Sequence, residues 1–457
     1  MVSISPTQAL RARLPGLLGK AKGNSGVLFG TQLAQALLRL VSFPIIAYFL
    51  DPDDYGVSLV VGSLLLTLTF LSETGAAPFT IRTDEGDEPR SLDTVWTISV
   101  IRGVLIGGVL FLSAPFAADL LDDERVKHAL RIGAIGAFLF ESRSLGHVLE
   151  QRYQNERKNA LIRLGIAVAT LPVQVGLAVW LEDWRALVWG IVFMNAASFV
   201  TSFLCYPVRH RFALDRTVAL SLWRFSRMIA ASSAVTLVML QFDKYFILAV
   251  ASLTVAGLFN NANNLIGVVE DLIRRHARSV FMPLAAARLR NGERGPEVFY
   301  GPLRLVRPLL VILCCGGITA GPAVIDVLLP ARYAGAGVFL SLLSLRGALI
   351  AIAQPQTSFL VADGGQRRVF YADTARLVWT VAAGVLGYLA FGVTGLVLGV
   401  ALRDLPPIVI QTHALMQRGV FSWRAEVSVL FAALVGLALG AAASAVAHAF
   451  GLAGGAA

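Results

Sequence analysis

The stretch FPIIAYFLDPDDYGVSLVVGSLLLTLTFLSETG, residues 43–75, contains two apolar runs separated by a short acidic turn. The turn, Asp51–Gly56, is only long enough to reverse the chain directly. A bilayer core needs about 20 mostly apolar residues in a helix. The first run extends back to residue 25 and the second runs on to residue 80, so this stretch predicts two consecutive membrane-spanning helices.

The same pattern recurs along the 457 residues and predicts an all-α polytopic membrane protein. The chain is 56% hydrophobic and 15% charged, whereas soluble domains are about 45–50% apolar and about 25% charged. A soluble enzyme, a disordered protein, a nucleic-acid binder and a disulfide scaffold are therefore poor interpretations. We expect thirteen spans, at residues 25–50, 56–80, 93–118, 127–149, 159–181, 185–206, 225–250, 253–280, 303–329, 334–360, 368–391, 393–416 and 425–450.

Lysine and arginine residues are concentrated in every second loop between the predicted spans. If the N-terminus is cytoplasmic, the cytoplasmic loops hold most of the 39 lysines and arginines, with the richest cluster around residues 274–307. The opposite loops hold only Arg125, Lys127, Arg185 and Arg332. Cytoplasmic loops of membrane proteins carry the excess of Lys and Arg. We therefore expect a cytoplasmic N-terminus, and the net charge of +10 reflects topology rather than nucleic-acid binding.

A polar, basic stretch after the sixth span divides the chain into two sets of six. Gly56 and Gly257 occupy matching places in tight turns of the two sets. Two such repeats around a central cavity are typical of transporters. We predict a cytoplasmic arm (1–24), an N-terminal lobe (25–207), a basic cytoplasmic linker (208–224), a C-terminal lobe (225–417) and one additional helix with an outer C-terminus (418–457).

Polar side chains within the spans indicate where a substrate binds, because ionisable groups in a membrane usually face a cavity or a partner. Gln32, Gln35 and Arg39 share one face of the first helix, and Arg102 lies within the third span. We expect all four to contact substrate. The alternatives are a structural hydrogen bond between helices for Arg39 and snorkelling to the membrane surface for Arg102.

The second half offers a similar set. Arg346 and Arg403 lie near the middle of their spans, and Arg346 is too far from either end to snorkel easily. Asn260 and Asn264 belong to the run FNNANNL, whose four amides cannot all face lipid. We expect these residues to bind substrate, with helix packing as an equal alternative for the asparagines.

Three further residues suggest ion coupling or gating. Asp243 and Lys244 lie near the outer end of their span, and an intramembrane carboxylate is the usual place for proton or sodium coupling. Asp404 precedes Pro406 and Pro407, which should break the helix beside a charge. We expect Asp243, Lys244 and Asp404 to act in coupling or gating, with a structural Asp243–Lys244 pair as the alternative.

Cations outnumber anions at membrane depth. Arginine can hold phosphate in a bidentate manner, so the surplus favours an anionic substrate over a cationic one. No loop is large enough for a catalytic domain, and no phosphate-binding loop or metal-ligand spacing occurs. We therefore expect no enzyme activity, catalytic residue, metal or cofactor. The two sets are Arg39, Arg102, Arg143, Lys244, Arg346 and Arg403 against Glu141, Asp243 and Asp404.

Residues 43–75 resemble the first two helices of the polysaccharide-transporter family, the Wzx-like flippases of the superfamily that includes the MATE exporters and the lipid II flippase. That family has an arginine in helix 1 and an L-x-P-x-D/E-Y/F-G turn, which correspond to Arg39 and to Leu50, Pro52, Asp54, Tyr55 and Gly56. LDTVWTISVIRG (92–103) resembles the third helix, and QFDKYFILAVASLTVAGLFNNANNL (241–265) resembles the seventh and eighth. The resemblance covers most of residues 25–417, although some members carry two extra helices rather than one.

The resemblance implies two lobes that alternate access and flip an undecaprenyl-pyrophosphate-linked oligosaccharide across the bacterial inner membrane. The implied partners are this lipid, the surrounding membrane lipid and glycan polymerase machinery. From the residues themselves we expect a monomer that binds no nucleic acid. Two other functions agree less well with the sequence. A MATE-like ion-coupled exporter should have a carboxylate-rich cavity, and a membrane glycan polymerase or ligase should have a long periplasmic loop.

Overall fold

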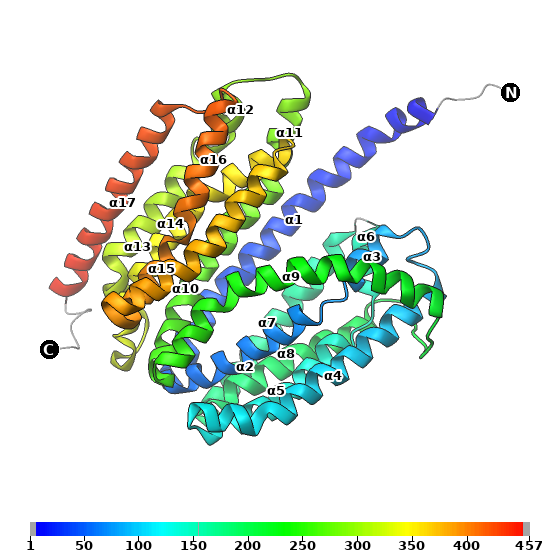
Figure 1. The fold of residues 1–457 in the computed structure, drawn as a ribbon, viewed down its shortest axis with the longest axis horizontal. Helices are drawn as coiled ribbons and strands as arrows, with labels where there is room; N and C mark the ends of the chain where they lie inside the picture. The colour runs from blue at the N-terminus through cyan, green and yellow to red at the C-terminus, as the bar shows by residue number, and fades with distance from the viewer. Residues whose placement is uncertain (1–5, 154, 451–457) are drawn as a thin grey trace. The chain divides into compact units, whose positions relative to one another are not determined.

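The computed structural model describes residues 6–153 and 155–450, and these residues form helices, turns and loops without a β-strand (Figure 1). Nine helices within them are long and apolar enough to cross a membrane. One of the nine, Gln366–Gln417, holds two of the predicted spans. The fold is that of an all-α polytopic membrane protein, as the sequence predicts, and each predicted span overlaps a long helix, although the spans at 56–80 and 127–149 are interrupted.

Long helices alternate with short ones at the turns in the first half of the chain. The helices are α1 (Pro6–Phe49), α2 (Pro52–Leu71), α3 (Ala76–Arg82), α4 (Pro89–Leu121), α5 (Glu124–Glu141), α6 (Gly146–Arg152), α7 (Glu156–Leu181), α8 (Arg185–Leu204) and α9 (Arg216–Val250). The arm predicted at 1–24 is continuous with the first span from Pro6 onward, and residues 1–5 lie outside the described residues.

The second half contains α10 (Leu253–His276), a π-helical turn η1 (Ala277–Phe281), α11 (Met282–Arg290), α12 (Pro296–Tyr300) and a 3₁₀ turn η2 (Gly301–Leu303). It continues with α13 (Val306–Leu328), the 3₁₀ turn η3 (Ala331–Tyr333), α14 (Ala336–Ala362) and α15 (Gln366–Ala401). The last elements are the 3₁₀ turn η4 (Leu402–Asp404), α16 (Leu405–Gln417) and α17 (Trp423–Ala449). Residues 451–457 lie outside the described residues.

Helix α2 begins and ends earlier than the span predicted at 56–80. Pro52 stands at its first position, where the missing N–H costs nothing. After Leu71 the chain turns through Gly75, whose φ of 62° lies in the left-handed region that favours glycine. The Glu73 carboxylate accepts a hydrogen bond from the Gly75 amide at 2.9 Å. The rest of the predicted span therefore forms the separate short helix α3.

The span predicted at 127–149 is also interrupted, between α5 and α6. The indole of Trp96 donates to the carbonyl of Ser142 at 3.1 Å. The amide of Ser144 donates to the hydroxyl of Ser202 at 2.9 Å. These two hydrogen bonds satisfy backbone groups of the turn that have no partner within the helix. The helix can therefore be interrupted at a buried position.

Packing divides the chain into two compact units. Unit 1 comprises the residues up to 46 together with 68–233, and unit 2 comprises 47–67 together with the residues from 234 onward. The divisions lie within α1, α2 and α9, so each of these helices contributes to both units. The segment predicted as the linker, 208–224, lies within unit 1.

In unit 1, the extended segment before α9 follows the first turns of α4. The amides of Arg211, Ala213 and Asp215 donate to side chains of α4, at 3.0, 3.2 and 3.1 Å. The Asp215 carboxylate also accepts from the amides of Thr217 and Val218, at 2.9 and 3.1 Å. Asp215 thus caps a helix N-terminus, which explains why α9 begins at Arg216, inside the predicted linker.

In unit 2, the two glycines that the sequence places at matching positions come together. A Cβ atom on Gly56 would overlap the carbonyl oxygen of Leu253, and one on Gly257 would overlap that of Pro52. Only glycine permits this approach of two backbones. Nearby, the hydroxyl of Tyr333 donates to the carbonyl of Leu50 at 2.6 Å. The turn between α1 and α2 is therefore fixed to the start of α10.

The additional helix α17 lies beside α13 (Figure 1). A Cβ atom on Gly436 or Gly440 would overlap a carbonyl oxygen of α13, a close approach typical of small residues spaced four apart in membrane helices. Near the start of α17, the buried Arg307 makes two hydrogen bonds of 3.0 Å to Glu426. The extra span is therefore packed into unit 2 along its length.

Candidate functional site

Unit 2 buries several charged side chains among its long helices. The charged cluster is defined here as Asp243 of α9, Glu270 of α10, Arg346 of α14, and Arg403 and Asp404 of η4. Four of these residues are 5% exposed or less, and the side chain of Arg403 is 12% exposed. Charged groups inside membrane proteins are costly and mark functional sites, so this cluster is the main candidate site.

Arg346 lies at the centre of the charged cluster, and three groups hold its guanidinium. Its Nε donates to Glu270 at 2.6 Å, and one terminal nitrogen donates to the side-chain oxygen of Asn263 at 2.8 Å. The other terminal nitrogen is 3.9 Å from Asp243. Glu270 also accepts from Arg274 at 2.9 Å. Arg346 thus joins α14 to α10 closely and to α9 more loosely.

Arg403 and Asp404 form the other side of the charged cluster. The nearest approach of Arg403 to Asp404 is 3.8 Å. Asp404 accepts a shorter bond, 2.8 Å, from Arg376 of α15, which also contacts Asp373. The 3₁₀ turn that carries both residues comes immediately before Pro406 and Pro407, where the sequence predicts a break in the helix. A helix interruption therefore lies next to buried charge.

The charges within this part of unit 2 are nearly balanced. Glu270 and Asp373, which the count along the sequence left out, are accompanied by Arg274 and Arg376, so the surplus in the second half stays at one cation. An anion that reached Arg346 would have to displace a carboxylate or arrive with a proton or a cation. The carboxylates are Asp243, Glu270, Asp373 and Asp404, and the cations are Lys244, Arg274, Arg346, Arg376 and Arg403.

The predicted asparagines do not join the charged cluster. Asn260 is half-buried and donates to the carbonyl of Tyr55 at 3.4 Å, while Asn264 is exposed. Asn263, between them, is the amide that contacts Arg346. Lys244 is half-buried beside Asp243, whose carboxylate accepts from the Lys244 amide at 3.0 Å. The four asparagine side chains therefore point into different surroundings, as expected for neighbouring residues of a helix.

In unit 1, Arg102 is paired rather than free. It is 8% exposed and lies 3.2 Å from Glu141. It also donates to the hydroxyl of Ser72 at 3.1 Å and to the carbonyl of Thr69 at 3.0 Å. These contacts hold the end of α2 against α4 and α5, so snorkelling does not describe this residue.

Arg39 differs from the other predicted arginines because its side chain is exposed. Gln35 and Gln32, one and two turns before it on α1, are half-buried. The predicted polar stripe on α1 is thus exposed at Arg39 and partly exposed at the two glutamines.

The residues missed from the sequence are Glu270, Asn263, Arg376 and Asp373. Glu270 stands four residues before Arg274 in a predicted span, which is the spacing of an intrahelical ion pair. That spacing could have identified it. The pairing of Arg376 with Asp404 joins residues far apart in the chain and leaves no local signal.

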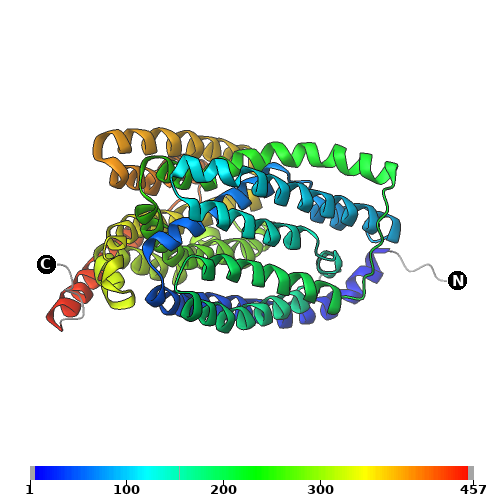
Figure 2. The ribbon, with the colours of Figure 1, turned by 90° about the horizontal axis from the view of Figure 1, so that it is seen from below.

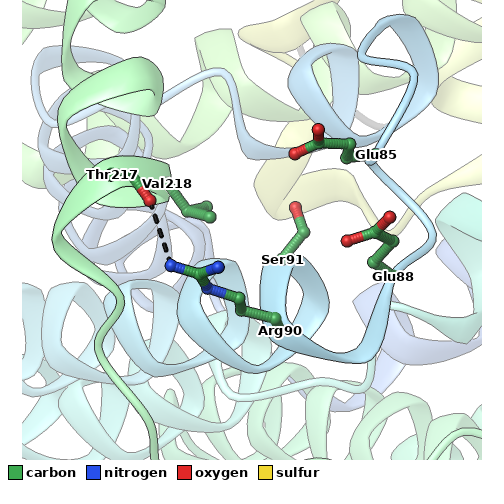
Figure 3. A pocket seen from close by; sticks show the side chains of 6 residues that line it. All are labelled: Glu85, Glu88, Arg90, Ser91, Thr217 and Val218. Carbon is green, nitrogen blue, oxygen red and sulfur yellow. Dashed lines mark hydrogen bonds between the residues drawn. The ribbon is translucent and has the colours of Figure 1, made fainter.

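A small surface hollow lies in unit 1 between the starts of α4 and α9 (Figure 3). Its volume of about 40 Å³ is room for a few water molecules. Arg90 spans it and donates to the Thr217 hydroxyl at 3.3 Å. The Thr217 hydroxyl and the Val218 amide hold the pKa of Asp215 well below its usual range. The hollow therefore belongs to the attachment of α9 rather than to a substrate site.

Comparison with known proteins gives a family match and several similar folds. A family model described as polysaccharide biosynthesis protein matches residues 45–337. The succinoglycan biosynthesis transport protein ExoT of Rhizobium meliloti (strain 1021) is 24% identical over 358 residues, which are 77% of this chain and 71% of that protein.

Two solved structures have a similar fold at low sequence identity. The lipid II flippase MurJ in an inward closed conformation matches with a TM-score of 0.67 and 12% identity, over 93% of this chain and 99% of that chain. An inward-facing multidrug resistance MATE family transporter of the MOP superfamily matches with a TM-score of 0.61 and 13% identity, over 88% and 95%. Both likenesses concern the fold.

Proposed function

Because the chain belongs to the polysaccharide biosynthesis protein family, we propose that it is a flippase for lipid-linked oligosaccharide. The proposed substrate is an O-antigen, capsule or exopolysaccharide repeat unit on undecaprenyl pyrophosphate. It would pass from the cytoplasmic to the periplasmic leaflet of the bacterial inner membrane, with the N-terminus in the cytoplasm. The related protein named for succinoglycan transport and the fold shared with the lipid II flippase support this substrate class.

The substrate's head group would bind at the polar stripe of α1. A pyrophosphate is an anion that arginine binds well, and the side chain of Arg39 is exposed. Gln32 and Gln35 add amide groups that suit sugar hydroxyls. The exposed Asn264 could serve the glycan from the second half in the same way. This accessible arginine is the observation on which the binding proposal mainly rests.

The charged cluster would couple transport to an ion. Asp243 is 3.9 Å from Arg346, whereas Glu270 is 2.6 Å from it, so Asp243 is the more easily exchanged partner. Binding of the coupling ion at Asp243 would weaken its contact with Arg346, loosen α9 from α14 and leave Arg346 able to attract an anion. In this scheme Arg346 and Arg403 supply positive charge to the substrate during part of the cycle, and Asp243, Lys244 and Asp404 act in coupling and gating. Arg102 would support the substrate site through its packing in unit 1.

Lipid extraction tests the proposal in cells. Cells that lack the protein should accumulate undecaprenyl-pyrophosphate oligosaccharide, detected by mass spectrometry, and the wild-type gene should restore the normal amount. Arg39→Ala should fail to restore it at equal membrane expression, and Arg39→Lys should restore it in part because the charge remains. An unchanged lipid pool in cells without the protein would refute the proposed substrate.

A second function, ion-coupled export of a small molecule, is favoured by one observation. The carboxylates and cations of the charged cluster nearly balance, which suits a cationic substrate better than a surplus of arginine would. In that case the lipid pool would remain normal, and cells lacking the protein would become sensitive to the exported compound.

A further inference from the structure

The end of unit 2 at which α13 begins combines exposed arginines with an ordered support. Beneath it, Phe281, Val298, Phe299 and Leu303 form an apolar core with residues of α14 and α16. The segment between α10 and α13 is therefore folded onto the helices. The exposed arginines at this end are Arg275, in the last turn of α10, and Arg278, Arg290, Arg294 and Arg304 of the segment.

Two arginines fix the shape of this segment from within. Arg288 donates to the carbonyl of Glu297 at 2.8 Å. Its guanidinium lies beside Gly301, where a Cβ atom would come within 2.9 Å of it. Arg294 donates to the carbonyl of Leu289 at 3.2 Å, at the end of α11. Arg288 thus holds the end of α11, where Arg290 also lies, next to Gly301 of η2. Gly301 precedes Arg304 by three residues.

An apolar stripe starts directly after Arg304. Leu305, Leu309 and Leu313 follow one another at intervals of four residues, and they are 76%, 64% and 56% exposed. Residues spaced by four share one face of a helix. Because α13 is long and apolar enough to cross a membrane, this face meets lipid chains. Positive charge therefore stands at the end of a track suited to an acyl chain.

We propose that this surface is a binding site for an anionic phospholipid. The headgroup phosphate is held by Arg304 and Arg290, and one acyl chain lies along Leu305, Leu309 and Leu313. Arginine donates charge-assisted hydrogen bonds to phosphate, and basic groups at a membrane surface attract anionic lipids. A zwitterionic lipid has the same chains but no net charge, so the site discriminates by headgroup.

Native mass spectrometry of the detergent-solubilised full-length protein tests the site. Phosphatidylglycerol and phosphatidylcholine with the same chains are titrated separately, and bound lipid is counted. The test variant is Arg290→Gln/Arg304→Gln. The control is Lys127→Gln/Arg185→Gln, which removes two cations that pair with carboxylates at helix starts in unit 1.

The wild type should bind phosphatidylglycerol more tightly than phosphatidylcholine. The test variant should lose about five-fold in phosphatidylglycerol affinity for each arginine, the equivalent of about 1 kcal/mol, while the control keeps wild-type affinity. Equal binding of the two lipids, or an equal loss in both variants, would overturn the proposal and leave the arginines as determinants of topology alone. Displacement of the lipid by millimolar inorganic phosphate would also overturn it, because a free phosphate gains nothing from the leucines.

Discussion

Replacing Glu270 by glutamine tests whether carboxylates hold the charged cluster together. Glu270 is 3% exposed and accepts bonds from Arg346 at 2.6 Å and Arg274 at 2.9 Å. Glutamine keeps the size of the side chain but removes its charge. Arg346 would then keep Asp243, at 3.9 Å, as its nearest carboxylate. Breaking a buried ion pair by removing one partner costs about 3–5 kcal/mol. Because Arg346 keeps other partners, we expect the free energy of unfolding to fall by about 3 kcal/mol.

The assay compares unfolding of the detergent-solubilised variants by denaturant, with the folded fraction followed by size-exclusion chromatography. Glu293→Gln is the matched control, because Glu293 is exposed and 4.0 Å from Arg288, and such surface pairs contribute about 0–1 kcal/mol. Adding Arg346→Met to Glu270→Gln should recover part of the loss, since the guanidinium that lost its closest carboxylate is then absent and Asp243 gives up only a contact of 3.9 Å. The reasoning is refuted if Glu270→Gln is as mild as the control, or if the second change adds its full cost.

Three further perturbations test the packing and the surface electrostatics. Gly257→Ala should lower the free energy of unfolding by about 1–3 kcal/mol, because its Cβ atom would overlap backbone atoms. The control Gly165→Ala should not lower it, because that Cβ atom would meet open space. Equal effects of the two substitutions would contradict the close approach. Glu426→Gln should weaken the anchoring of α17, because it leaves the buried Arg307 unneutralised, and faster proteolysis near that helix is the readout; an unchanged rate would argue against the pair. The pKa of Asp215 lies below its usual range, so its contribution to stability is present above the ordinary pKa of about 3.9 and is lost as the pH falls through the lower folded-state value. The difference in melting temperature between wild type and Asp215→Asn should therefore be constant from about pH 8 to pH 5 and shrink below about pH 4, and a difference that grew on acidification would contradict the assignment.

Hydrophobic run length predicted the helices well, because a membrane imposes nearly the same requirement on every span. The interruptions were harder to predict. Helix α5 ends near Glu141 because Trp96 and Ser202, distant in sequence, supply hydrogen bonds to the following turn. The start of α9 at Arg216 has a local cause in Asp215, a capping residue that the sequence alone could have identified.

The candidate site was only partly predictable for a similar reason. The sequence drew attention to Arg346, Arg403, Asp243 and Asp404, and the structure brings these four residues into one buried cluster. It could not show that Arg346 is already paired, because its main partner, Glu270, is distant in the chain. The sign of a buried site depends on such pairings. A count of charges along the sequence therefore could not show how much of the positive charge is already paired.

The matching positions of Gly56 and Gly257 are the most informative local signal. Their similar places in two turns suggested an internal repeat, and the structure shows that the turns pack against each other. A glycine required for close packing cannot be distinguished in the sequence from a glycine required for a turn. The contact between the two turns therefore could not be predicted from the sequence.

Flipping in reconstituted vesicles tests the central claim most directly. Purified protein is incorporated into liposomes with a fluorescent undecaprenyl-pyrophosphate oligosaccharide, and a membrane-impermeant reagent added outside measures the fraction of labelled lipid in the outer leaflet. The account predicts that wild-type protein exposes nearly all of the labelled lipid to the reagent, while Arg39→Ala leaves about half protected, as in protein-free liposomes. Protection of about half of the lipid with wild-type protein, under every ion gradient tried, would contradict the proposed function.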